Sequence, residues 1–132
     1  MVYYVSNQQQ LFTPIDYTLL SVENSLQMLQ SWNMIQYDSE TTGRDCHINQ
    51  LLLMQFGNMD GSIQIVVDCT TVDPLLYKDI LESKYLIGQN IKFDLKFLYN
   101  YSIKPLKVYD TMIVEQLIYL AYPHFMIGAL RI

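Results

Sequence analysis

Three strand patterns follow one another between residues 34 and 67, and this run constrains the fold more than any other feature of the sequence. Residues 34–37 and 51–56 are short apolar segments, and residues 63–67 alternate between apolar and polar side chains, as a half-buried strand does. The sequence Gly-Asn-Met-Asp-Gly at 57–61 is typical of a hairpin turn. Three strands in direct succession predict an antiparallel meander.

Helices and strands alternate in the second half of the chain. Asp73 followed by Pro74 marks a helix start, because proline is favoured at the first helical position. The pattern predicts helices over 73–83, 91–101 and 110–121, with strands over 85–88 and 107–109 between them. Such alternation predicts parallel strands joined by right-handed crossovers. The fold class is therefore α/β, with a mixed sheet that is antiparallel first and parallel after, flanked by helices.

The two ends of the chain complete this outline. Residues 1–20 are interpreted as a short aromatic strand with an irregular lead-in, and residues 21–132 as the main domain, opened by a helix over 21–32. The helix over 110–121 is apolar nearly all round, which is typical of a buried helix, and Pro123 ends it. Residues 124–132 look like the start of an element that is cut short, so we expect the domain to be incomplete at its C-terminus.

The composition excludes several classes of protein. A chain of 132 residues supports one domain, and 51% hydrophobic residues suffice to build its core. No apolar run approaches the roughly 18 residues of a membrane span, and the N-terminus lacks the positive charge of a signal peptide. Cys46 and Cys69 are too few for a disulfide framework or a zinc site, so we expect a cytoplasmic protein without membrane contact.

The charge balance is acidic, with 8 basic against 13 acidic side chains and a net charge of −5. This argues against a broad basic face for nucleic acid, but it leaves open an acidic site that binds metal ions before it meets phosphate. Asp38 and Glu40 stand two residues apart at the end of the first strand, so their side chains point to the same face. Two such carboxylates favour a hard cation, although a solvated strand end is the better interpretation of this pair alone.

Asp94 favours the cation site over the solvated strand end. It lies one turn into the helix over 91–101, directly after a short buried strand, while Phe93, Phe97 and Leu98 can serve the core. A lone aspartate on a helix is usually solvated. Beside the Asp-x-Glu pair, however, Asp94 would be a third carboxylate in one crevice at the edge of the sheet.

Three motifs in this order resemble those of a known family. Residues 38–43 read Asp-x-Glu-Thr-Thr-Gly, and Asn90, Asp94 and Leu98 follow an Asn-x-x-x-Asp-x-x-x-Leu pattern with an aromatic residue before the aspartate. Asp-Thr-Met at 110–112 follows a strand and starts a helix. Over roughly residues 20–122 the chain resembles the 3′–5′ exonucleases of the DEDD superfamily, which have a ribonuclease H-like fold, and especially the proofreading domain of DNA polymerase I-type enzymes.

The resemblance implies an activity and a set of residues. Two divalent metal ions, Mg²⁺ or Mn²⁺, would hydrolyse phosphodiester bonds at the 3′ end of single-stranded DNA. By position, Asp38 would bridge both ions, Glu40 would bind the first and Asp94 would help to hold the second. Thr41 and Asn90 would contact the substrate. The family also implies a polymerase domain as partner.

One part of the family pattern is missing. The third motif, Tyr-x-x-x-Asp or His-x-x-x-x-Asp, supplies a fourth carboxylate, and no acidic residue follows Glu115 in this chain. Two alternatives therefore stay open: an inactive or incomplete exonuclease-like domain that binds nucleic acid or a polymerase partner, and an RNA-trimming exonuclease of the same superfamily. Because the helix over 110–121 has few residues left to cover it, we also expect a homo-oligomer or a downstream polypeptide that completes the fold.

Overall fold

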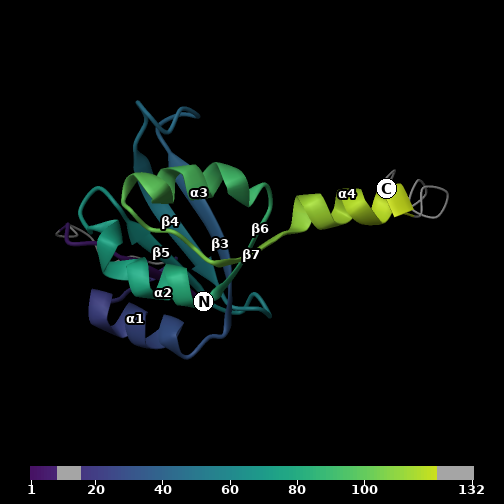
Figure 1. Ribbon diagram of the computed structural model, residues 1–132. Helices are drawn as coiled ribbons and strands as arrows, with labels where there is room; N and C mark the ends of the chain where they lie inside the picture. Colours follow the sequence, from purple (N-terminus) through teal and green to yellow (C-terminus); the bar gives the residue numbers. More distant parts are fainter. Residues whose placement is uncertain (9–15, 122–132) are drawn as a thin grey trace.

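A seven-stranded mixed sheet with helices packed on one of its faces makes up the body of the protein (Figure 1). The computed structural model describes residues 1–8 and 16–121. The strand order in the sheet is β2-β1-β5-β4-β3-β6-β7. The strands are β1 Val2–Val5, β2 Thr18–Leu19, β3 Met34–Thr41, β4 Leu51–Gly57, β5 Gln64–Asp68, β6 Tyr85–Gly88 and β7 Lys107–Asp110. The helices are α1 Val22–Gln30, the 3₁₀ turn η1 Pro74–Tyr77, α2 Lys78–Ser83, α3 Ile91–Asn100 and α4 Thr111–Ala121.

The predicted sheet is confirmed in its main features. Strands β3, β4 and β5 form an antiparallel meander, and β6 and β7 add to the β3 edge in parallel. Strand β3 is longer than the predicted segment 34–37, because its pairing with β4 continues through the polar residues to Thr41 opposite Leu51. The predicted helix over 73–83 is divided between η1 and α2.

The N-terminal strand belongs to the same sheet as the rest of the chain. Strand β1 pairs in parallel with β5, and β2 pairs in parallel with β1. Gln64 also donates its backbone N–H to the carbonyl of Met1, at 2.9 Å. The division of the chain at residue 20 remains a prediction, but β1 extends the sheet on the edge far from β7.

The core lies on one face of the sheet. Pairing across the strands aligns Tyr37, Phe56 and Ile65 in one row and Ser39, Met54 and Val67 in the next. All six side chains are buried, and buried side chains from α1, α2 and α3 complete the same cluster. The next residues along β3 point to the opposite face, where Gln36, Asp38 and Glu40 are exposed. We call these two sides the covered face and the open face.

Helix α4 contradicts the prediction that it is buried. None of its residues is buried, and Leu117 and Leu120 are 59% and 74% exposed. Figure 1 shows α4 leaving β7 and projecting away from the sheet. The physical reason is its position, because β7 is the last strand of the sheet and α4 continues outward from this edge. The expected helix end at Pro123 and the short element over 124–132 lie outside the described residues.

The helices of the part of the chain that the structure describes include none long and apolar enough to cross a membrane.

Candidate active site

Strand β3 presents Asp38 and Glu40 on the open face. Both side chains are exposed, and the buried Ser39 lies between them on the covered face, as the alternation of a strand requires. Asp38 pairs with Gln55 of β4, and Glu40 pairs with Leu53 just before a register shift in the ladder. Asp38 and Glu40 thus lie on the same face of β3, as the strand period predicted.

The edge of β3 that faces β6 becomes free just before these acids. Pairing between the two strands ends at Gln36 opposite Ile87, so the later residues of β3 have no strand neighbour on this side. Gly88 lies directly against this edge, since a Cβ atom there would stand 2.9 Å from the carbonyl oxygen of Tyr37. A glycine at this point therefore lets the start of α3 approach β3 closely.

Asp94 comes from α3 on the covered side of the sheet. The residue is only 4% exposed, and its Oδ1 accepts a hydrogen bond from the hydroxyl of Ser39. Burial raises the pKa of Asp94 to about 6, although the hydrogen bond from Ser39 opposes this rise, and the negative charge of Asp38 adds to it. Asp94 and Asp38 are thus electrostatic neighbours around the free edge of β3, one from each side of the sheet.

The structure does not gather all three predicted carboxylates into one compact cluster. Within the described ranges, the group of three possible metal ligands whose atoms lie within 4.8 Å of one another is Asp45, Cys46 and His47, in the loop after β3. Asp94 instead meets β3 at Ser39, and Glu40 remains exposed on the open face. Their convergence on a cation therefore stays a prediction.

The two predicted substrate contacts lie beside this edge. Thr41 ends β3 and donates its hydroxyl to the carbonyl of Gly43, at 2.7 Å. Asn90 has left-handed backbone angles, with φ 52° and ψ 43°, and its side chain makes no capping hydrogen bond to α3. An asparagine tolerates this conformation better than most residues, which allows the sharp turn from β6 into α3.

Asp110 is a residue whose role here the sequence did not reveal. Its carboxylate accepts hydrogen bonds from the backbone N–H groups of Asn90 at 3.0 Å and Ile91 at 3.1 Å, and from that of Met112 at 2.9 Å. One carboxylate at the end of β7 therefore caps the starts of both α3 and α4. The sequence indicated only the second cap, because the parallel pairing of Gly88 with Asp110 becomes apparent only in the folded sheet.

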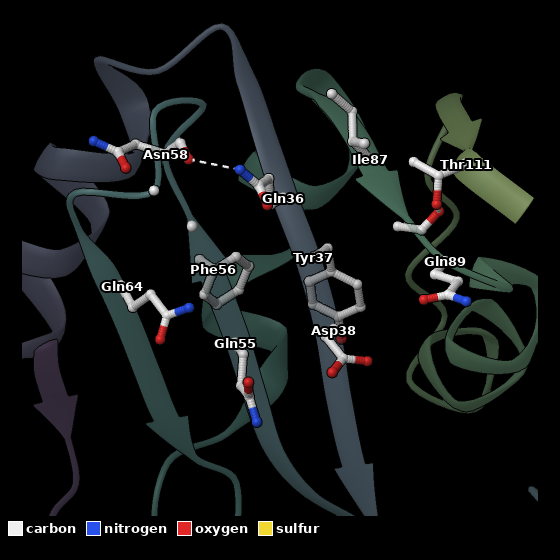
Figure 2. A pocket seen from close by; sticks show the side chains of 13 residues that line it. Gln36, Tyr37, Asp38, Gln55, Phe56, Asn58, Gln64, Ile87, Gln89 and Thr111 are labelled. Carbon is white, nitrogen blue, oxygen red and sulfur yellow. Dashed lines mark hydrogen bonds between the residues drawn. The ribbon is translucent and has the colours of Figure 1, made fainter. Parts of the chain in front are cut away.

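A pocket of about 420 Å³ opens beside Asp38 (Figure 2). Figure 2 shows its walls rising from β3, β4, β5 and the end of β6. Gln36 donates to the carbonyl of Asn58 across it, at 2.9 Å. Its lining is rich in amide side chains: Gln36, Gln55, Asn58, Gln64 and Gln89. The described part of the open face is therefore hollow and polar next to the first predicted metal ligand.

The chemistry of Asp38 and Asp94 fits a hard divalent cation. Carboxylate oxygens are the ligands that Mg²⁺ prefers, and two neighbouring carboxylates are costly without a positive charge. Among the described side chains the ion pair is Lys78 with Glu82, at 3.8 Å, so no basic side chain neutralises Asp38 or Asp94. An acidic pair that has no basic partner among the described residues can accept a metal ion.

A family model described as a 3′–5′ exonuclease matches residues 17–124, which include every residue of the candidate site. The chain belongs to this 3′–5′ exonuclease family. Its members are hydrolytic nucleases, and the mixed sheet found here is the ribonuclease H-like fold that the motifs indicated. The match confirms the fold class and the family that residues 38–43 and 90–98 predicted, but it does not test the roles of individual side chains.

Several proteins are similar to this chain. DNA polymerase I of Aquifex aeolicus (strain VF5) is 30% identical over 98 residues, which are 74% of this chain and 16% of that protein. NrnC of Brucella melitensis with bound Mg²⁺ has a TM-score of 0.60 at 20% identity, covering 88% of this chain and 52% of that one. The catalytic core of RRP6 from Trypanosoma brucei has a TM-score of 0.64 at 17% identity, over 88% of this chain and 30% of that one. The chain thus spans about half or less of each relative.

Proposed function

We propose that this chain is the nucleolytic part of a metal-dependent 3′–5′ exonuclease of the DNA polymerase I type, which removes nucleotides from the 3′ end of single-stranded DNA. One observation carries the proposal. Asp94, a residue that is only 4% exposed, interacts electrostatically with Asp38 around the free edge of β3, and no basic side chain of the described chain forms an ion pair with either. Phosphodiester hydrolysis is the chemistry that such a site, once it holds divalent cations, supports in this family.

The proposed site holds two divalent ions, Mg²⁺ or Mn²⁺. Asp38 would be a ligand of both, Glu40 would bind one and Asp94 would help to hold the other. When bound, the ions supply positive charge to the phosphate and make a water molecule acidic enough to attack near neutral pH. The Mg²⁺ in the related NrnC structure supports this choice of metal. Thr41 and Asn90, at the ends of β3 and β6, are the proposed contacts to the terminal nucleotide.

The fourth carboxylate of the family pattern has no counterpart after Glu115 in this sequence. No acidic residue follows Glu115, and the chain covers only 16% of the related polymerase and 52% of NrnC. We therefore propose that a polymerase domain or another downstream polypeptide supplies it. We also propose that the protein is cytoplasmic, because Cys46 and Cys69 are free thiols, as expected in a reducing compartment. The apolar surface of α4 supports either this contact or self-association, which light scattering after size exclusion distinguishes.

The missing acid also favours a second candidate function, namely an inactive exonuclease-like domain that binds nucleic acid or a polymerase partner. The relatives leave the nucleic acid open as well. Besides DNA polymerase I they include Escherichia coli RNase D, an exoribonuclease, with a TM-score of 0.57 at 22% identity over 68% of this chain and 24% of that one. We prefer DNA because of the match to the polymerase.

The experiment compares cleavage of 3′-labelled single-stranded DNA and RNA in Mg²⁺ or Mn²⁺ by this chain and by a form extended to include a fourth carboxylate. We expect slow or undetectable cleavage by the chain alone and cleavage of DNA by the extended form. Asp38→Ala should abolish that activity, while Glu115→Gln on the exposed helix α4 serves as the control. Full activity of the unextended chain, lost with Asp38→Ala, would show that the fourth acid is dispensable. Binding of nucleic acid without cleavage by either form would favour the second candidate.

A further inference from the structure

Ser39 is an exception on the covered face of the sheet. Its neighbours in the same row, Met54 and Val67, are core hydrophobics, yet Ser39 is a hydroxyl side chain and the residue is only 8% exposed. A buried hydroxyl costs free energy unless it is hydrogen-bonded. Ser39 meets this requirement with one partner, the Oδ1 atom of Asp94.

The geometry points to Ser39 as a positioning residue, which holds the carboxylate of Asp94 at the free edge of β3 so that its second oxygen is available to a divalent cation beside Asp38. This inference rests on the proposed function, because it takes Asp38 and Asp94 as metal ligands. It assigns a role to the residue between the two acids of the Asp-x-Glu motif, whose side chain points away from both.

The position of the strand makes this role possible. Asp38 lies on the open face and Asp94 reaches β3 from the covered face, so the two carboxylates can share a cation only around the free edge. The hydroxyl of Ser39 fixes one oxygen of Asp94 at this edge, and the backbone N–H of Ser39 stabilises the same carboxylate more weakly. Without the hydroxyl, the Asp94 carboxylate loses the side-chain donor that holds it at this edge.

A second buried aspartate shows what a purely structural arrangement looks like. Asp68 accepts hydrogen bonds on both of its carboxylate oxygens, and none of these donors comes from a predicted site residue. The donors are Tyr4, Ser6, Thr70 and Thr71. Among the described residues, Asp94 has a single side-chain donor, on one oxygen. One oxygen of Asp94 therefore remains able to bind a cation, whereas both oxygens of Asp68 are already occupied by hydrogen bonds.

The test measures Mn²⁺ binding directly, by electron paramagnetic resonance of the free ion, together with the rise in Tm that Mn²⁺ produces. We expect Ser39→Ala to weaken Mn²⁺ binding on the order of tenfold, the usual effect of losing a group that orients a metal ligand. Ser39→Thr, which restores the hydroxyl, should bind Mn²⁺ nearly as the wild type does. Ser25→Ala is the control, because Ser25 is also a buried serine, and its hydroxyl is hydrogen-bonded away from the site, to the carbonyl of Val22 at 2.6 Å and the hydroxyl of Tyr77 at 2.7 Å.

Each outcome decides one question. Equal Mn²⁺ affinity of the wild type and Ser39→Ala would overturn the positioning role while leaving the metal site in place. If Ser39→Ala fails to fold, Ser39→Cys keeps the size of the side chain with a weaker donor, and it should show a smaller loss of affinity. Weaker Mn²⁺ binding in Ser25→Ala as well would show a general effect of stability and overturn the inference. A wild type that binds no Mn²⁺, or binds it unchanged after Asp38→Ala, would overturn the proposed function and this inference with it.

Discussion

Helices α3 and α4 are built alike and packed differently. Each follows a parallel strand, and the carboxylate of Asp110 caps the first turn of both. Helix α3 carries the charged residues Lys92, Asp94 and Lys96 and is nevertheless packed into the core, whereas the more apolar α4 has no buried residue. Position in the sheet, and not apolar content, decides the burial of these helices, because α3 returns over β3 whereas α4 leaves the sheet after its last strand.

The largest expected effect separates the two helices by chemistry. Asp94→Asn keeps the size of the side chain in α3 and an oxygen for the Ser39 hydroxyl, but it removes the charge that the cation requires. In the form extended by a fourth carboxylate, we expect the metal-dependent rate on 3′-labelled single-stranded DNA to fall at least a thousandfold, since losing an essential group costs orders of magnitude. Glu115→Gln, the same change in α4, should leave the rate within about twofold. Equal rates for the two variants would show that Asp94 is not part of the site.

The next effect separates the helices by packing. Phe97 of α3 is 1% exposed, so Phe97→Ala should lower the free energy of unfolding by about 3–5 kcal/mol in urea titrations. Leu117 of α4 is exposed, and Leu117→Ala should change that free energy by less than about 0.5 kcal/mol. A large loss with Leu117→Ala would mean that α4 is packed in solution, against a second copy or another part of the polypeptide.

These differences show which parts of the molecule the sequence could predict. The meander, the parallel strands and the start of α3 follow from local patterns, such as the alternation over 63–67 and the hairpin turn 57–61. The shared face of Asp38 and Glu40 follows from the strand period alone. The sequence indicated that few residues remain to cover α4. That none of its residues is buried, and that Asp110 caps two helices, depend on which strands become neighbours and could not be predicted. The contact of Ser39 with Asp94 depends on how closely Gly88 lets α3 approach β3.

A smaller effect concerns the cap that the two helices share. Asp110→Ala removes three hydrogen bonds from backbone N–H groups at the starts of α3 and α4, and we expect a loss of about 1–2 kcal/mol in the free energy of unfolding. Asp73→Ala is the control, since Asp73 caps η1 through one such bond, to Leu75 at 2.9 Å, and should cost less. Hydrogen exchange should also become faster at Ile91 and Met112. A loss no greater than that of Asp73→Ala would show that Asp110 caps only one helix in solution.

The smallest effect is a pH dependence that belongs to α3 alone. Burial raises the pKa of Asp94 to about 6 in the folded protein, above its value in the unfolded chain, so the folded state binds the proton more tightly. The contribution of Asp94 to the free energy of unfolding is therefore fully present below about pH 4, where the carboxyl is protonated in both states. It is lost as the pH rises through 6. Asp94→Asn has no proton to lose, so it should be more stable than the wild type at pH 7.5, by on the order of 1 kcal/mol after solvent screening. The difference should vanish near pH 4, and Mn²⁺ should reduce it at pH 7.5 by stabilising only the wild type. If the wild type is as stable as Asp94→Asn at pH 7.5 without metal, the ionised Asp94 carboxylate does not destabilise the folded protein. Its proximity to Asp38 then gives no reason to expect a bound cation.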